Sequence, residues 1–134
     1  MTAKMAVVAH GGAGSGPARQ TNLQVAVDVA SKLLLSGASA VEAAVEACVI
    51  LEDDPVFNAG TGGVFRIDGS VLLDASIQTS DGRIGFVIAM KETPNPIRVA
   101  ADLLDHNING LTGDGARSWA CLLYTSDAAD DLVG

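Results

Sequence analysis

The chain is poor in aromatic and basic side chains. Aromatic residues make up only 4% of its 134 residues, so a core must be built from valine, isoleucine, leucine and alanine. Eight lysines and arginines stand against sixteen acidic residues, which gives a formal net charge of −8 at pH 7. Because no basic stripe is available to neutralise phosphates, the sequence argues against a nucleic-acid partner.

Cysteines and long apolar runs are scarce as well. The two cysteines, Cys48 and Cys121, lack metal-ligand spacing and provide no disulfide framework. Cys48 falls on a predicted helix face and is expected to be a small buried hydrophobe. No apolar run is long enough for a signal peptide or a bilayer span, so we expect a cytoplasmic protein without a membrane partner. Hydrophobic residues still make up 49% of the chain, which argues against disorder.

Glycine and proline divide the first half into elements. Residues 5–9 (MAVVA) predict a buried strand that ends at a glycine-rich turn. Apolar positions three and four residues apart predict a helix over residues 22–36, which Gly37 ends. Ser39 and Glu42 have the capping-box spacing of a second helix. Its expected buried stripe consists of Val41, Ala44, Val45, Cys48 and Val49.

The next segment is predicted to form a hairpin and a buried strand. Asp68-Gly69 is a typical turn between strands at residues 64–67 and 71–73. The continuous apolar run at residues 85–90 (GFVIAM) suits a strand that is covered on both faces. We therefore expect a mainly antiparallel sheet.

A third helix follows the sheet. Asn95 is expected to cap it, and Pro96 suits its first position because proline needs no hydrogen-bond acceptor there. Its apolar positions continue toward Ile108. Two adjacent helices and a mainly antiparallel sheet favour an α+β fold class.

The segment at residues 51–63 (LEDDPVFNAGTGG) carries the strongest local constraints of the chain. Pro55 fixes its own φ and disfavours helical backbone at Asp54, so the second helix must stop there. Glycines allow backbone conformations and close approaches that other residues do not. The loop contains Gly60, Gly62 and Gly63. A loop so constrained around one carboxamide, Asn58, indicates a function.

The last stretch of the chain changes character. Residues 121–130 (CLLYTSDAAD) share no periodicity with the residues before them. They resemble the conceptual translation of a transposon-end adaptor used in preparing sequencing libraries. We therefore expect the natural sequence to end near Ala120, with residues 121–134 a read-through artefact. The alternative is an ordinary short C-terminal segment, and the codons of the source DNA decide between the two.

Several segments in register carry a family resemblance. They are VVAHGGAG (residues 7–14), LEDDPVFNAGTGG (residues 51–63), LDASI (residues 73–77) and NPI (residues 95–97). In this order and spacing the chain resembles the N-terminal half of plant-type asparaginases, also called isoaspartyl peptidases, which are N-terminal nucleophile hydrolases. The resemblance implies a four-layer αββα sandwich, of which residues 1–120 would form most of the α-subunit portion.

The chemistry that this resemblance implies needs residues that the chain lacks. Family members cleave themselves, and the threonine exposed at the start of the β subunit attacks L-asparagine or β-aspartyl peptides, with its own α-amino group as base. No cofactor is required. No GTVGAVALD-like segment with such a threonine occurs here, so we expect no catalytic residue in this chain and no activity from it alone. Its expected partners are the missing β subunit, the small substrate and, in the intact enzyme, a second αβ unit.

The resemblance also implies supporting roles for residues that are present. Asn58 is expected to lie close to the nucleophile and to position it or a water, since a carboxamide offers both a donor and an acceptor. The alternative is that Asn58 hydrogen-bonds its own turn. His10, Gly11 and Gly12 are expected to form a mobile turn near the maturation site. An anion cradle of backbone N–H groups is the other functional hypothesis for this turn.

The loop at residues 51–63 further resembles the family's sodium-binding stabilisation loop. Backbone carbonyls supply the oxygen ligands that a hard cation prefers. The expected donors to a structural sodium ion are the main-chain oxygens of Leu51, Glu52, Asp54, Phe57, Ala59 and Thr61. The alternative for Asp53 and Asp54 is a solvated acidic pair at a helix end.

Other interpretations stay open. The turn at residues 77–82 is longer than the Met-Asp-Gly turn of many relatives, so glycosylasparaginase and taspase-like branches are alternatives. A non-enzymatic binding or scaffold half-domain would require the chain to fold cooperatively alone. A nucleotide-binding domain built on the HGGAG turn would require saturable ATP binding. Asp74 is expected to be a buried, hydrogen-bonded structural carboxylate, and Asp105 and His106 are expected to be surface residues.

Overall fold

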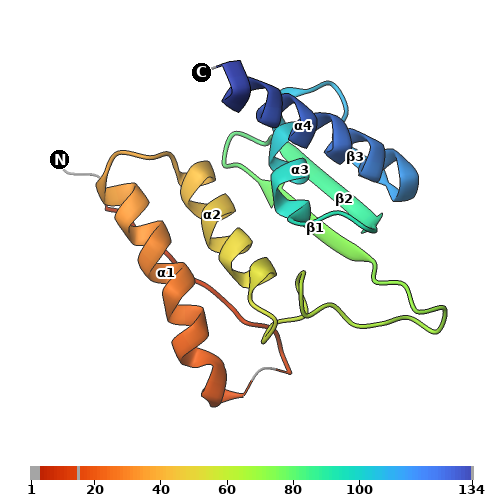
Figure 1. The fold of residues 1–134 in the computed structure, drawn as a ribbon. Coiled ribbons are helices and arrows are strands. Elements are labelled where there is room, and N and C mark those ends of the chain that lie inside the picture. The colour runs from red at the N-terminus through yellow and green to blue at the C-terminus, as the bar shows by residue number, and fades with distance from the viewer. Residues whose placement is uncertain (1–3, 15, 134) are drawn as a thin grey trace. The chain divides into compact units, whose positions relative to one another are not determined.

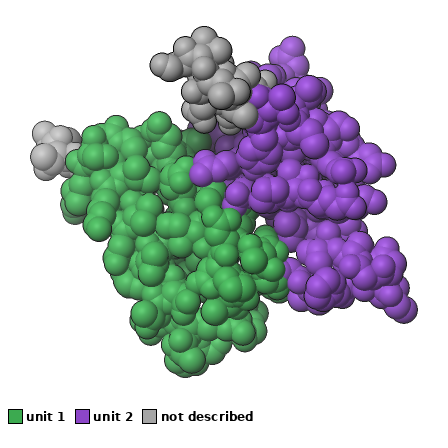
Figure 2. All heavy atoms as spheres, in the orientation of Figure 1, with its two compact units in different colours: residues 1–62 green, residues 63–134 purple. Residues whose placement is uncertain are grey.

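The computed structural model of the chain describes residues 4–14 and 16–133, with side chains as far as Thr125. The chain forms two compact units, Met1–Gly62 and Gly63–Gly134 (Figures 1 and 2). The elements of the described residues are η1 (Pro17–Arg19), α1 (Gln20–Leu35), α2 (Ala40–Asp53), β1 (Leu73–Gln78), β2 (Ile84–Met90), α3 (Pro96–Asp102), η2 (Leu103–Asp105), β3 (Gly110–Thr112) and α4 (Gly113–Val133). The predicted α+β class is confirmed, and the four-layer sandwich stays a proposal.

The first unit contains a pair of packed helices, α1 and α2 (Figure 1). The predicted capping box starts α2: Glu42 N donates to Ser39 Oγ over 3.1 Å, and Ser39 N donates to Glu42 Oε2 over 2.7 Å. Gly37 follows α1 with a left-handed φ of +96°, and Ala38 N donates back to Leu33 O over 3.0 Å. Both helix ends are therefore set by local sequence, as predicted.

Alanines make the contact between these two helices. Ala26 and Ala30 of α1 form a buried cluster with Ala43 and Ala47 of α2. Small side chains at a helix contact let the two backbones approach closely. The predicted stripe on α2 was partly wrong, because Ala44 is exposed, and Ala43 and Ala47, which were not predicted, are buried instead. Alanine contributes little to an apolar pattern. The sequence pattern therefore does not show which face of α2 packs against another alanine-rich helix.

The predicted strand at residues 5–9 is wrong. These residues pair with no strand in the described part of the chain. Met5 and Val8 are 54% and 94% exposed, whereas Val7 packs against the alanine cluster. A strand requires a hydrogen-bonded neighbour, and an apolar run alone does not provide one.

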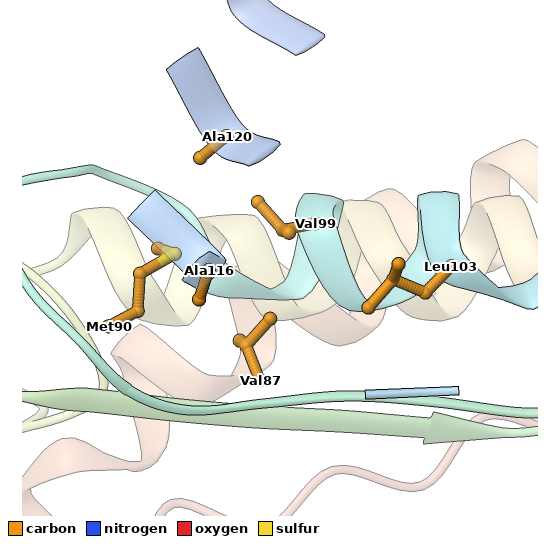
Figure 3. Close-up of a cluster of buried hydrophobic side chains, with 6 residues drawn as sticks. All are labelled: Val87, Met90, Val99, Leu103, Ala116 and Ala120. Atoms are coloured by element: carbon orange, nitrogen blue, oxygen red, sulfur yellow. The ribbon is translucent and has the colours of Figure 1, made fainter. Parts of the chain in front are cut away.

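The second unit is built on a three-stranded sheet in the order β1-β2-β3. β1 and β2 form an antiparallel hairpin, and β3 pairs with β2 in parallel. Side chains from β2, α3, η2 and α4 meet on one face of this sheet and form its core (Figure 3). The buried members are Val87, Met90, Val99, Leu103, Ala116 and Ala120. Neither β3 nor the parallel pairing was predicted.

The opposite face of the sheet is open. Ile84 and Ile88 of β2 are 37% and 48% exposed. Phe86, between them, lies over Gly110, where a Cβ would collide with its ring. The prediction that residues 85–90 are covered on both faces is therefore wrong for the described chain. The helices α3 and α4 supply one covering layer only.

The predicted hairpin at residues 64–73 forms only its turn. Gly69 has a left-handed φ of +81°, and Ser70 N donates to Asp68 Oδ1 over 3.0 Å. Residues 64–67, 71 and 72 are not in strands, and Leu73 is the first residue of β1. Val64, Phe65 and Ile67 are 69%, 76% and 108% exposed. The tight turn is local chemistry, but the strands it would join need a partner.

The C-terminal helices also differ from the prediction. α3 starts at Pro96 as predicted, although Asn95 makes no side-chain cap and takes a left-handed φ of 52°. α3 ends at Asp102 and is followed by a short 3-10 turn, so the helix stops well before Ile108. α4 continues past Cys121 to Val133. An adaptor-derived sequence can form a helix as well as a natural one. The interpretation of residues 121–134 as a read-through artefact therefore stays a prediction. Among the described residues no helix is long and apolar enough to cross a membrane.

Candidate functional site

The loop that follows α2 is fixed by Asp54. The backbone turns at Asp54 to an extended ψ of 115°, immediately before Pro55, as predicted. The Asp54 carboxylate accepts the Val56 N–H over 3.0 Å and the Asn22 Nδ2–H over 2.8 Å. Asn22 belongs to α1, so Asp54 holds the loop against the first helix. The alternative of a solvated acidic pair is wrong for Asp54.

Two glycines let the loop fold back on itself. Thr61 N donates to Glu52 O over 2.7 Å and closes the loop onto the last turn of α2. A Cβ on Gly60 would lie 2.9 Å from the Glu52 carbonyl carbon, and one on Gly62 would lie 2.9 Å from the Pro55 carbonyl carbon. Both distances are shorter than the contacts that Cβ atoms make in real structures. The predicted need for glycine at these two positions is confirmed.

The tip of the loop has a buried anchor and an exposed carboxamide. Phe57 is 4% exposed, and its N–H donates to Asp54 O over 3.1 Å. The next residue, Asn58, is exposed, and its carboxamide has no hydrogen-bond partner among the described residues. The alternative that Asn58 hydrogen-bonds its own turn is wrong. Its donor and acceptor are available to another group.

The HGG turn lies beside this loop. Gly12 N donates to His10 Nδ1 over 3.0 Å, and Gly12 has a left-handed φ of 95°. A surface hollow of about 340 Å³ is lined by the HGG turn and, from the loop at residues 51–63, by Phe57 and not by Asn58. Its lining residues are His10, Gly11, Gly12, Gly16, Pro17, Arg19, Gln20, Leu23 and Phe57. The structure thus brings together two motifs that lie more than forty residues apart in the sequence.

Sequence reasoning missed three of the polar groups around these motifs. Arg19 and Gln20 line the hollow, and Asn22 holds Asp54. Each lies in η1 or in the first turn of α1, where polar side chains are common and carry no motif. Only the packing of α1 against the loop could have identified them.

A second hollow of about 320 Å³ lies between residues 6–10 and the two helices. It is lined mainly by alanine, valine and leucine, and Cys48 is half-buried at its wall. Burial raises the pKa of the Cys48 thiol, and the nearby Glu52 carboxylate raises it further. Cys48 therefore behaves as the small hydrophobe that was predicted, although it is not fully buried.

The loop has the donor chemistry that a hard cation prefers, namely uncharged main-chain oxygens. Phe57 O and Pro55 O both lie against the position that a side chain on Gly62 would fill, so they are near neighbours. Glu52 O and Asp54 O each accept one backbone N–H, and a carbonyl oxygen has a second lone pair. No group of three His, Cys, Asp or Glu side chains among the described residues could hold a metal ion. A cation here would be held by the main chain.

Other predicted residues lie in the second unit. Asp74 accepts the Ala89 N–H over 2.8 Å, which confirms a structural hydrogen bond, but the Asp74 side chain is exposed and not buried. His106 Nε2 lies 3.5 Å from Asp102 Oδ2, and the His106 ring packs edge-on against Trp119. Asp105 pairs with Arg83 over 3.0 Å and is exposed. The surface positions of Asp105 and His106 are confirmed.

Comparison of the sequence with known proteins identifies the family of the chain. Residues 3–128 match the asparaginase family, and the chain belongs to it. It is 43% identical over 103 residues to an isoaspartyl peptidase/L-asparaginase from a Nostoc species, a match that covers 70% of this chain and 32% of that protein. It is 39% identical over 129 residues to the plant-type L-asparaginase of Pyrococcus horikoshii, covering 89% of this chain and 41% of that protein.

A mammalian relative gives the same picture. The chain is 39% identical over 126 residues to the isoaspartyl peptidase/L-asparaginase of Macaca fascicularis, covering 87% of this chain and 41% of that protein. The chain thus spans 32% to 41% of the length of these curated relatives. Because the chain matches only part of each relative, the activity of the complete protein is a proposal.

Proposed function

We propose that this chain is the α-subunit portion of an autoprocessing amidohydrolase that acts on L-asparagine or β-aspartyl peptides. The observation that carries the proposal is the hollow shared by the HGG turn and the loop at residues 51–63. The relatives that bear the names asparaginase and isoaspartyl peptidase support the substrate class. The nucleophilic threonine would belong to the part of those relatives that this chain does not match.

In this proposal the residues of the chain position the reacting groups, and none of them attacks the substrate. Asp54 holds the loop to α1, and buried Phe57 anchors its tip. The Asn58 carboxamide then stands at a defined place with both a donor and an acceptor available. It would hold the threonine hydroxyl or a water beside it, and a preorganised dipole of this kind stabilises charge that develops during reaction.

The open face of the sheet supports a layered fold for the complete protein. Ile84, Phe86 and Ile88 present apolar surface on the side away from α3 and α4. Exposed apolar surface of this extent is typical of a face that another layer covers. We propose that the second sheet of a four-layer αββα sandwich packs there.

A chimaera tests the proposed function. Residues 1–120 of this chain would replace the matching region of the Pyrococcus horikoshii plant-type L-asparaginase. We expect the chimaera to split into two chains on a denaturing gel and to release ammonia from L-asparagine, whereas the 134-residue chain alone does neither. A folded chimaera that neither splits nor hydrolyses asparagine would refute the proposal. Hydrolysis by the 134-residue chain alone would refute the assignment of the nucleophile to the missing part.

Within the chimaera, Asn58→Ala tests the positioning role. We expect hydrolysis to fall by about 10²-fold, the typical cost of removing one preorganised hydrogen-bonding group. Asn107→Ala is the matched control, because Asn107 is also an exposed asparagine but lies in the second unit and not in the loop at residues 51–63. Equal activities of the two variants would exclude Asn58 from the site.

The structural sodium ion is a separate proposal that rests on the carbonyl-rich loop. We expect the thermal midpoint of the chain to be higher in sodium chloride than in choline chloride at equal ionic strength, since a ligand that binds only the folded state stabilises it. Equal midpoints in the two salts would contradict an ion in the loop.

A further inference from the structure

The hydrogen bond inside the HGG turn defines the protonation pattern of His10. The Gly12 backbone N–H can only donate, and it meets Nδ1 over 3.0 Å. Nδ1 must therefore offer its lone pair, so a neutral ring carries its proton on Nε2. Moving that proton to Nδ1 would place two N–H groups face to face and break the turn.

We propose that His10 acts at the hollow as a fixed hydrogen-bond donor through Nε2–H, and that it takes a ligand with a carbonyl or carboxylate oxygen. His10 is exposed and lines the hollow together with the glycines of its own turn. Its second nitrogen is already used, so the ring has a donor to offer and no free acceptor. His10 is thus a positioning and binding residue, not a general base.

The surroundings of His10 suit such a ligand. Arg19, from η1, is the charged side chain that lines the same hollow, and its positive charge favours an oxygen acceptor. Gln20 adds a neutral amide. Cys48, from α2, is the titratable side chain that lines the neighbouring hollow with His10, and burial raises its thiol pKa and keeps it neutral. The described residues that line these two hollows therefore include no carboxylate.

The hydrogen bond can be tested directly in the chain labelled with ¹⁵N. In the neutral ring we expect His10 Nδ1 to carry no proton and to show a scalar coupling to the Gly12 amide. His106 is the internal control, because it is the other histidine of the chain and its Nε2 lies 3.5 Å from the Asp102 carboxylate. A protonated Nδ1, or the absence of the coupling, overturns the inference.

Two substitutions of His10 distinguish the effect of the acceptor atom at the Nδ1 position from the effect of replacing the ring. In His10→Asn the amide oxygen takes the place of Nδ1, so we expect the Gly12 amide to keep its protection from hydrogen exchange. In His10→Gln the carboxamide sits one methylene further out, and the protection should be lost. Equal protection in the two variants would contradict the acceptor role. If neither variant folds, the coupling in the unsubstituted chain still decides.

Acetate and acetamide then test whether His10 Nε2–H donates a hydrogen bond to a ligand. One of the two compounds should shift the Gly12 amide resonance, acetate if the ligand is a carboxylate and acetamide if it is a carbonyl. His10→Asn should lose this shift because it has no donor at the Nε2 position. Absence of a shift with both probes overturns the ligand half of the inference. The inference rests on the proposed function in placing a ligand at this hollow, but none of these readouts requires hydrolysis. Its failure is therefore distinguishable from failure of the chimaera.

Discussion

Replacing Gly62 by alanine is the sharpest test of the loop. An alanine Cβ would lie 2.9 Å from the Pro55 carbonyl carbon and closer still to the oxygens of Pro55 and Phe57. Ordinary contacts between carbon atoms are about 3.5–4.0 Å. All three contacting atoms belong to the backbone, so no side chain can turn away, and the loop must open. Overpacking of this kind costs about 1–3 kcal/mol.

Urea unfolding of the chain measures this cost. With a denaturant slope of about 1–3 kcal/mol per molar for a small protein, a loss of about 2 kcal/mol lowers the midpoint by about 1 M. Gly14→Ala is the matched control, since nothing lies within 4 Å of the Cβ position there. We expect the control to unfold within about 0.5 kcal/mol of the unsubstituted chain. Equal midpoints for Gly62→Ala and the unsubstituted chain would refute the reasoning.

Three further predictions concern other parts of the chain. Cys121, which is exposed, should react with a thiol reagent faster than half-buried Cys48, whose pKa is raised by burial and by the Glu52 carboxylate; equal labelling rates would contradict this. Ala89→Gly should stabilise the chain by up to about 1 kcal/mol in urea, because the φ of 56° is left-handed. Hydrogen bonds from Ser39 lower the pKa of Glu42, so Glu42 stabilises the fold above its unfolded pKa and less as the pH falls through its folded pKa. Acidification should therefore destabilise the unsubstituted chain more than Glu42→Gln, and parallel pH profiles would count against the capping box.

The candidate site was predictable where backbone chemistry is local. Pro55 ends α2 in the structure as it must, and Gly60 and Gly62 occupy positions where a Cβ has no room. The sequence also singled out Asn58, which proved to be exposed at the tip of the loop. The role of Asp54 was not predictable, because its partner Asn22 lies on another helix and carries no motif.

The fold divides in the same way. The turn at Asp68-Gly69 forms, but residues 64–67 beside it form no strand, and residues 71–73 contribute only Leu73, the first residue of β1. A turn is made by its own residues, whereas a strand needs a hydrogen-bonded neighbour. Residues 5–9 fail for the same reason. The parallel pairing of β3 with β2 joins residues that are far apart in sequence, and three residues are too few to show a pattern.

The amino-acid sequence by itself determined the family, the α+β class, the ends of α1 and α2 and the shape of the loop at residues 51–63. Each of these depends on short-range contacts or on a matching order of motifs. Only the tertiary structure showed that His10 and Phe57 line one hollow, that Asn22 holds Asp54, and that one face of the sheet is open. These features depend on the packing of side chains from distant segments, and no periodicity along the chain encodes which distant segments meet.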